Sequence, residues 1–445
     1  MAIDVIPSLP ARVFYPRATV IMSCLFDDQV GGVAPATFQV IPRSVEVFRN
    51  SARKADTCRL EIDYRDFPLD PRTLQDVQIS VHMESVRDPS LPVTPTLLNR
   101  RFVGLVDEPH SELGRDKQVV SIEARDFTGI WLDFKWGATN PAGTSVLAPT
   151  AIPTPPGSTL QTAVEYMRTK VTPLTPPAVF TDPVAAGTDV SLRTGRSFFT
   201  AQNDDESAWD VLCALCDLFG LVPVYDQDIL TIRTPTEPGA NIINLEYGVA
   251  VERLEFYRNL KQNKEKQVKI VAWNPVTGIP LEAVYPPIAS VLALNEKGKL
   301  KPTTKQVQYN VEGLYDPATL ALLAQRVYTE ITQNVVMGEL ETRELRDPLQ
   351  QPLMSASNGD ILFCRLGTAD QGSIASMSPA EQYAFLSDPT RTNSLNPAAA
   401  QALVQSWNAA QRLSSKFYIL EAVHKWDRED GYRLTIRFRD FILGA

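Results

Sequence analysis

The chain has 445 residues, 44% of them hydrophobic and 21% charged, and this composition is ordinary for a soluble globular protein of about three domains. Its net charge of −9 argues against a protein that grips nucleic acid, because such a grip needs basic residues to neutralise phosphates. The five cysteines are scattered and odd in number, which excludes a secreted disulfide framework and favours folding in a reducing cytoplasm. The sequence has no run of about 18 apolar residues, so we expect no membrane span, and its first residues lack a signal-peptide pattern.

Residues 1–136 predict a first β-domain. Short β-branched or alternating segments, separated by turn residues, indicate strands at 19–22, 44–49, 58–64 and 77–83. Segments 101–107 and 118–125 follow as a long hairpin.

Residues 137–243 predict a proline-rich linker and a middle helix-hairpin domain. We expect one helix from Ser158, acting as N-cap, to about residue 170. A stronger amphipathic helix starts near Asp205, whose acidic neighbours suit a helix N-terminus, and ends at Gly220. A small hairpin follows at 222–233.

Residues 244–445 predict a second β-domain with helical insertions. We expect strands at 267–273, 335–345 and 361–366, and helices at 316–334 and 397–412. The chain closes with a hairpin of 417–426 and 432–441, for which Asp430 and Gly431 predict a type I′ turn. The fold class expected is therefore α+β and mostly β.

The tripeptide Arg-Asp-Phe ends both long hairpins and also occurs at 65–67. Chance recurrence is one explanation, and the shared hairpin context favours a duplicated β-domain instead. Two similar domains in each chain of a trimer would give six similar units in a ring. The residues that we select as interface candidates are Arg125, Asp126, Phe127, Arg439, Asp440 and Phe441.

In pattern and order, the chain resembles the hub proteins of contractile phage tails, the late-control D-type family, which are related to the N-terminal half of type VI secretion spike proteins. The segments that carry the resemblance are 102–107, 120–133, 207–221, 228–233, 359–362 and the last hairpin.

This resemblance implies two tube-like β-domains in each chain of a homotrimer that adapts a six-fold tail tube to a three-fold spike and continues the tail channel. The implied partners are a tail-tube or distal tail protein, a spike protein and other baseplate proteins, in a virion tail baseplate assembled in the host cytoplasm. Fused spike proteins continue into a β-helical needle. This chain stops at Ala445, so we expect the spike to be a separate chain.

No residue pattern predicts an enzyme, a cofactor or a metal site. Cys213 and Cys216 form a C-x-x-C pair, but both lie on the apolar side of the expected helix, which favours core packing over redox chemistry. The three histidines lack metal-binding spacing. The acidic run 204–206 is better explained by helix capping than by paired carboxylates, and the lysines of 261–305 by a solvated face.

Two other functions stay open. The first is a tail-borne cell-wall hydrolase, which the missing nucleophile and histidine motifs disfavour. The second is a carbohydrate-binding or adhesion module built from residues 205–235.

Overall fold

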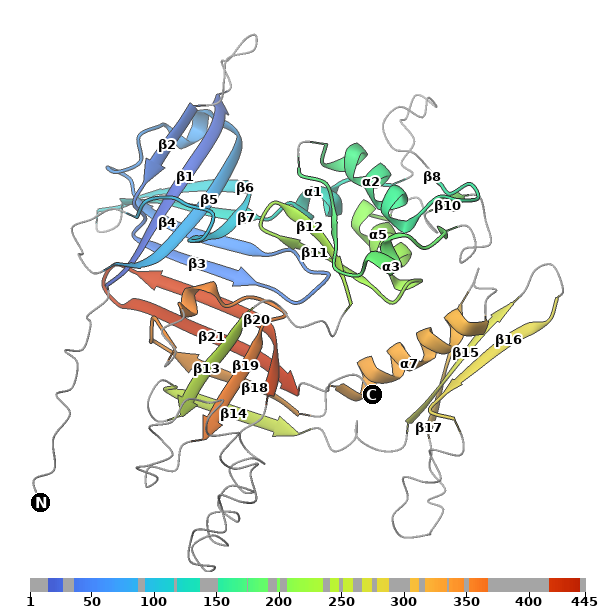
Figure 1. The fold of residues 1–445 in the computed structure, drawn as a ribbon. Helices are drawn as coiled ribbons and strands as arrows, with labels where there is room; N and C mark the ends of the chain where they lie inside the picture. The colour runs from blue at the N-terminus through green and yellow to red at the C-terminus, as the bar shows by residue number, and fades with distance from the viewer. Residues whose placement is uncertain are drawn as a thin grey trace, which may run out of the picture.

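The structure is a computed structural model that describes most of the chain as a large sheet with two smaller units beside it (Figure 1). The described residues are 15–26, 36–86, 93–115, 118–136, 151–173, 175–190, 198–200, 206–234, 241–247, 251–258, 266–273, 278–287, 305–311, 317–333, 336–347, 352–366 and 416–440. The expected helix at 397–412 lies outside these residues.

The large sheet draws its strands from both ends of the chain. They are β1 (Tyr15–Phe26), β2 (Ala36–Val40), β3 (Ser44–Arg49), β4 (Thr57–Asp63), β5 (Leu74–Val86), β6 (Arg100–Leu113), β7 (Gln118–Arg125), β13 (Ile242–Tyr247), β14 (Arg253–Arg258), β18 (Val336–Thr342), β19 (Ile361–Leu366), β20 (Lys416–Asp427) and β21 (Gly431–Asp440). Their order is β14-β18-β21-β20-β3-β4-β7-β6-β5-β1-β2, and β19 and β13 branch off beside β20.

Alternating sequence explains why one face of this sheet is buried. In β4, Cys58, Leu60 and Ile62 point inward, and the residues between them are exposed or half-buried. They share one continuous hydrophobic core with residues of β20 and β21, such as Ile419 and Leu434. The fold class expected from the sequence, α+β and mostly β, is confirmed.

The middle of the chain forms a unit with its own core. Its elements are α1 (Thr128–Asp133), β8 (Ala151–Pro153), α2 (Leu160–Val171), β9 (Val179–Phe180), α3 (Pro183–Ala186), β10 (Phe198–Thr200), α5 (Ala208–Asp217), β11 (Val222–Asp226) and β12 (Ile229–Arg233). Trp131, Trp136 and Trp209 lie at the centre of this core. The helix expected from Asp205 is α5, and its N-cap is Ser207, whose side chain and that of Asp210 form a capping box.

Two local predictions need correction. The N-cap of α2 is Thr159 and not Ser158, since the Thr159 side chain accepts a hydrogen bond from the backbone N–H of Thr162. The last hairpin pairs Asp427 with Gly431 across residues 428–430. Of the two residues predicted to form the turn, Asp430 and Gly431, only Gly431 has a positive φ, at 81°. A type I′ turn needs a positive φ at both, so this is a three-residue turn closed by a glycine bulge.

A third unit lies between β14 and β18 in the chain. The strands β15 (Lys266–Trp273), β16 (Pro280–Tyr285) and β17 (Lys305–Val311) form a sheet that α7 (Pro317–Gln333) covers (Figure 1). Arg326 of α7 ties this unit to α5, because its Nη2 lies 3.0 Å from Oδ1 of Asp217. Two short 3-10 helices, Pro71–Thr73 and Leu353–Ser355, complete the described elements. No helix in the described ranges is long and apolar enough to cross a membrane.

Candidate functional site: the junctions of two repeated strand units

The large sheet contains the same four-strand arrangement twice. The first unit is β3-β4-β7-β6 and the second unit is β14-β18-β21-β20, both antiparallel throughout. In spatial order, each unit ends with the first strand of a long hairpin, which is β6 in the first unit and β20 in the second. The order of the strands is therefore a structural repeat, independent of sequence identity.

The two hairpins also match in register. Leu105 lies opposite Arg125 in the first unit, and Tyr418 lies opposite Arg439 in the second. Each ladder then skips one residue two positions later: the breaks fall between Val106 and Glu108 and between Ile419 and Glu421. A β-bulge at the same position in both hairpins bends the two strands at equivalent points.

The strands that flank the hairpins match as well. β5 pairs with β6 only as far as Leu105, and β19 pairs with β20 only as far as Tyr418, both before the bulge. Beyond its bulge, β20 pairs instead with β3, from Ala422 to Asp427. This pairing joins the two units into one sheet.

The junction between β20 and β3 is tightly buried. Trp426 lies opposite Val45 and His424 opposite Val47, and each of these four residues is at most 2% exposed. The His424 ring bridges two segments at 2.8 Å, from Nε2 to the carbonyl of Ala356 and from Nδ1 to the hydroxyl of Tyr432. Burial lowers the pKa of His424 to about 3, so the ring is neutral at pH 7.

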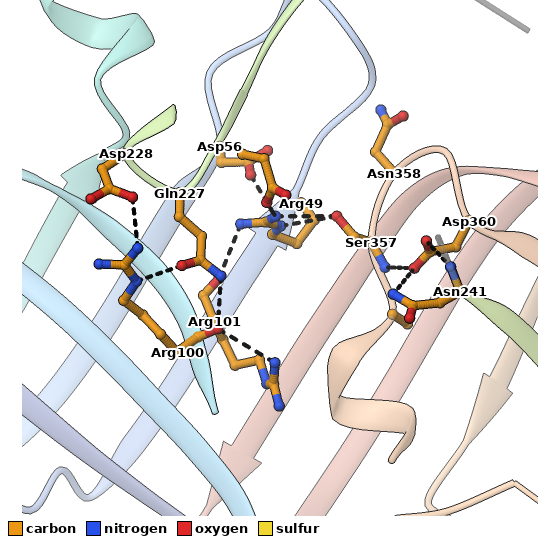
Figure 2. A network of polar contacts seen from close by, with 12 residues as sticks. Arg49, Asp56, Arg100, Arg101, Gln227, Asp228, Asn241, Ser357, Asn358 and Asp360 are labelled. Carbon is orange, nitrogen blue, oxygen red and sulfur yellow. Dashed lines mark hydrogen bonds and ion pairs between the residues drawn. The ribbon is translucent and has the colours of Figure 1, made fainter. Parts of the chain in front are cut away.

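Arg49, the last residue of β3, connects the first unit, the second unit and the middle unit (Figure 2). Its Nε lies 3.2 Å from Oδ2 of Asp56, and its Nη2 lies 2.7 Å from Oδ1 of Asp226 in β11 and 3.1 Å from Oγ of Ser357. Nη1 also donates to the carbonyl of Arg101 at 3.1 Å. Arg49 as a whole residue is only 7% exposed. These hydrogen bonds therefore replace the water that would otherwise hydrate its guanidinium group.

Burial raises the pKa values of two carboxyl groups near Arg49. Burial raises the pKa of Asp56 to about 6, although Arg49 and the backbone N–H of Asn50 favour the ionised form. Burial also raises the pKa of Asp126, and the nearby Asp56 raises it further. Burial and the proximity of the two carboxylates therefore both disfavour ionisation of Asp126.

A second polar group holds the loop before β19 in place. The Asp360 carboxylate accepts hydrogen bonds from the backbone of Ser357 at 2.8 Å and from the backbone and side chain of Asn241, both at 3.3 Å (Figure 2). Burial raises the pKa of Asp360 to about 6. The neighbouring Asn358 donates to the carbonyl of Asn50 at 2.6 Å, so this loop is bonded directly to the end of the first unit.

The middle unit makes a matching contact with β6. The Arg100 guanidinium donates to Gln227 and, at 2.6 Å, to Asp228, in the turn between β11 and β12 (Figure 2). A cleft of about 810 Å³ runs along these groups and is lined by both arginines and Asp56. The acidic and basic side chains here are mostly bonded to one another, which suits a fixed junction better than a reaction centre. No group of three or more potential metal ligands occurs in the part of the chain that the structure describes.

Comparison with known proteins finds no matching protein-family model and no matching curated protein. Solved structures do match. A tail protein from Neisseria meningitidis MC58 aligns with a TM-score of 0.56 and 12% identity over 96% of both chains. The 43 kDa tail protein of prophage MuSo2 from Shewanella oneidensis aligns with a TM-score of 0.55 and 12% identity, over 95% of this chain and 98% of that chain.

The chain has the fold of a phage tail protein. The fold expected from the resemblance is thus confirmed over almost the whole length. A component of the E. coli type VI secretion system also matches, with a lower TM-score of 0.47 and 8% identity, over 94% of this chain and 77% of that chain.

Within this tail-protein fold, the interface candidates of the first hairpin take separate positions. Arg125 forms ion pairs with Asp107 at 2.8 Å and Asp133 at 2.9 Å. Asp126 is 3% exposed, and its carboxylate accepts a hydrogen bond from the backbone N–H of Thr128, the first residue of α1. The Phe127 ring lies 6.0 Å from that of Tyr225, in the middle unit. These three residues connect the first unit to the middle unit within one chain.

The candidates of the last hairpin are only partly described. The Arg439 guanidinium lies over the Tyr418 ring, 5.1 Å from its centroid. The backbone of Asp440 pairs with Phe417, and Phe441 lies outside the described residues. Whether any of the six touches another chain stays a prediction.

Sequence patterns did not identify Arg49, Arg100 or Asp360. Arg49 ends an alternating strand and Asp360 follows a turn, and both positions usually carry solvated polar residues. Cys213 and Cys216 lie in the core as expected, and burial raises the pKa of both thiols, that of Cys213 to about 12. Such thiols are poor nucleophiles.

Proposed function

We propose that the protein is a structural hub of a phage tail or a related injection machine, built as a homotrimer and without catalytic activity. In this role it joins a six-fold tail tube to a three-fold spike and continues the tail channel. Its partners are a tail-tube or distal tail protein, a separate spike chain and other baseplate proteins, and its place is the tail baseplate of the virion.

The repeat of the four-strand unit is the observation that carries this proposal. One chain offers two similar units, so three chains around an axis offer six. A ring of this kind presents near-six-fold symmetry through its repeated units and three-fold symmetry through the parts that occur once per chain. The middle unit, and the unit of β15, β16, β17 and α7, are such parts.

The polar junction around Arg49 supports a rigid hub. A ring that transmits force needs its units held in fixed orientation, and buried ion pairs fix geometry even where they add little net stability. The net charge of −9 also suits a protein that lets nucleic acid pass without binding it.

Light scattering of the purified full chain over a wide concentration range tests the trimer. We expect a mass that approaches three times the 49.3 kDa of one chain as the concentration rises. A chain that stays monomeric at high concentration, and also with its tail partners present, contradicts the hub. Glycan binding or peptidoglycan cleavage by such a monomer would instead favour one of the other two functions.

A further inference from the structure

We propose that β6 of one chain pairs in antiparallel fashion with β14 of a second copy, and so repeats between chains the junction that β20 and β3 form within each chain. This inference rests on the proposed trimer and adds to it the two strands and their register.

The two strands stand at equivalent ends of the repeat. β20 is the last strand of the second unit and pairs, beyond its bulge, with β3, the first strand of the first unit. β6 is the last strand of the first unit, and on the side away from β7 its pairing in the described structure ends at Leu105, before the bulge. β14 is the first strand of the second unit and, among the described strands, stands at one end of the sheet. The operation that joins two units within a chain therefore also places β6 against β14 of a neighbour.

The repeat fixes the register of this pair. Val47 lies opposite Cys58 in the first unit as Phe256 lies opposite Gly338 in the second. Counting from the shared bulge, Ser111 of β6 takes the place of His424 of β20. In the proposed junction, Ser111 therefore lies opposite Phe256 of the second copy, at the position that corresponds to His424 opposite Val47 within the chain. One position earlier on β6, His110 lies opposite Tyr257 of that copy.

Burial differs between equivalent positions in the way that this pairing predicts. Val47 is 0% exposed and its equivalent Phe256 is 39% exposed; Trp426 is 2% exposed and its equivalent Leu113 is 61% exposed. Tyr257, next to Phe256, is 57% exposed. An outer strand with exposed aromatic side chains is a template for another strand. A second copy would cover these apolar side chains as β20 covers those of β3.

Two positions depart from the junction within the chain. Pro109 stands where β20 has Ala422 and provides no N–H, so the ladder on β6 extends mainly from residue 110 onward. Glu112 stands where β20 has Lys425, which lies opposite Glu46. The proposed register places Glu112 opposite Glu255 of the second copy. Like charges facing each other across strands weaken a pairing, so we expect this junction to be weaker than the one within the chain.

Head-to-tail pairing of this kind closes into a ring when its rotation matches a simple symmetry. With two units per chain, three copies alternate three junctions within chains and three between chains. All six junctions then join equivalent strands, and the first and last strand of each unit both have a neighbouring strand.

Disulfide trapping tests the register directly. The double variant His110→Cys with Tyr257→Cys places both thiols at directly opposed and exposed positions. The matched control, His110→Cys with Glu255→Cys, keeps the same face of β14 but is two residues out of register. All five native cysteines are free and buried, so background cross-linking is low. After mild oxidation and denaturation, we expect covalent trimers from the first variant, released by a reductant, and mostly single chains from the control.

The outcomes separate this inference from the proposed function. If light scattering gives a trimer but the first variant stays uncross-linked, or the control cross-links better, the proposed β6–β14 register is wrong. The proposed hub function is not contradicted by that result. If the chain is monomeric under all conditions and nothing cross-links, both fail.

A charge substitution gives a second, independent test. Glu112→Lys recreates the Lys425–Glu46 pairing and should tighten the trimer by about two- to five-fold per junction. Glu108→Lys makes the same charge change on the same strand, before the proposed register begins, and should have no such effect. Equal tightening by both variants, or none from Glu112→Lys, contradicts the register.

Discussion

Nη2 of Arg49 lies 2.7 Å from Oδ1 of Asp226, although 177 positions separate the two residues in the chain. One residue at the end of β3 thereby joins the first unit to the middle unit, and its contact with Ser357 adds the second unit. Arg49 therefore bonds to all three of these units, beside the strand pairing of β20 with β3 and the contact of Arg100 with Asp228.

Replacing Arg49 by alanine should destabilise the protein strongly. The change leaves Asp56 buried without its ion-pair partner, which costs about 3–5 kcal/mol in comparable cases. Chemical denaturation followed by tryptophan fluorescence measures this loss. Arg59→Ala is the control, since its pair with Glu123 has side chains 61% and 65% exposed and should contribute about 0–1 kcal/mol. Equal losses for the two variants would show that the junction is not what Arg49 stabilises.

Asp360 should make stability depend on pH in a defined direction. Its folded-state pKa of about 6 is above the ordinary value of 3.8, so its stabilising contribution is complete below pH 4 and is lost as the pH rises through 6. Relative to Asp360→Asn, the wild-type protein should lose on the order of 2–3 kcal/mol between pH 4 and pH 7.5, from about two pKa units. Denaturation of both proteins across this range provides the comparison, in which the contributions of Asp56 and His424 cancel. A constant difference would mean that Asp360 is not shifted.

Alanine at Gly104 should disturb the first hairpin. An added Cβ would collide with the carbonyl oxygen of Arg125, a backbone atom of the paired strand β7. Overpacking of this kind costs about 1–3 kcal/mol, which thermal denaturation measures as a lowered Tm. Gly187→Ala is the matched control, because its Cβ would lie 3.6 Å from the nearest atom and its φ is −81°. A Tm for Gly104→Ala as high as that of this control would contradict the close packing.

The thiols should react only when the protein unfolds. All five cysteines are buried, and burial raises the pKa of Cys213, Cys216 and Cys364, so little thiolate is present at pH 8. We expect labelling by a thiol reagent to be slow in the native protein and to reach five groups in denaturant. Rapid labelling of Cys213 and Cys216 in the native protein would contradict the core-packing interpretation and favour a redox site.

Local structure was predictable where local chemistry decides it. Short β-branched or alternating segments identified β3, β4 and β5, because burial of one face follows from the period of the sequence. A proline in the first turn identified α7. The cap at Thr159 was placed one residue too early, because neighbouring residues compete for the same backbone N–H. The strands β14, β16 and β17 were not predicted at all. The shared Arg-Asp-Phe ending marked two hairpins whose arginines do occupy equivalent ladder positions.

The sequence by itself determined many of the strands, such as β3, β4 and β7, and the final hairpin, because these depend on residues a few positions apart. Only the tertiary structure decided that β20 lies beside β3, that both units have one strand order, and that Arg49 meets Asp226 and Ser357. Contacts between residues 177 and 308 positions apart leave no periodic trace in the sequence. They arise when whole faces pack together, and that packing also turns ordinary polar residues at strand ends into the junction between the units.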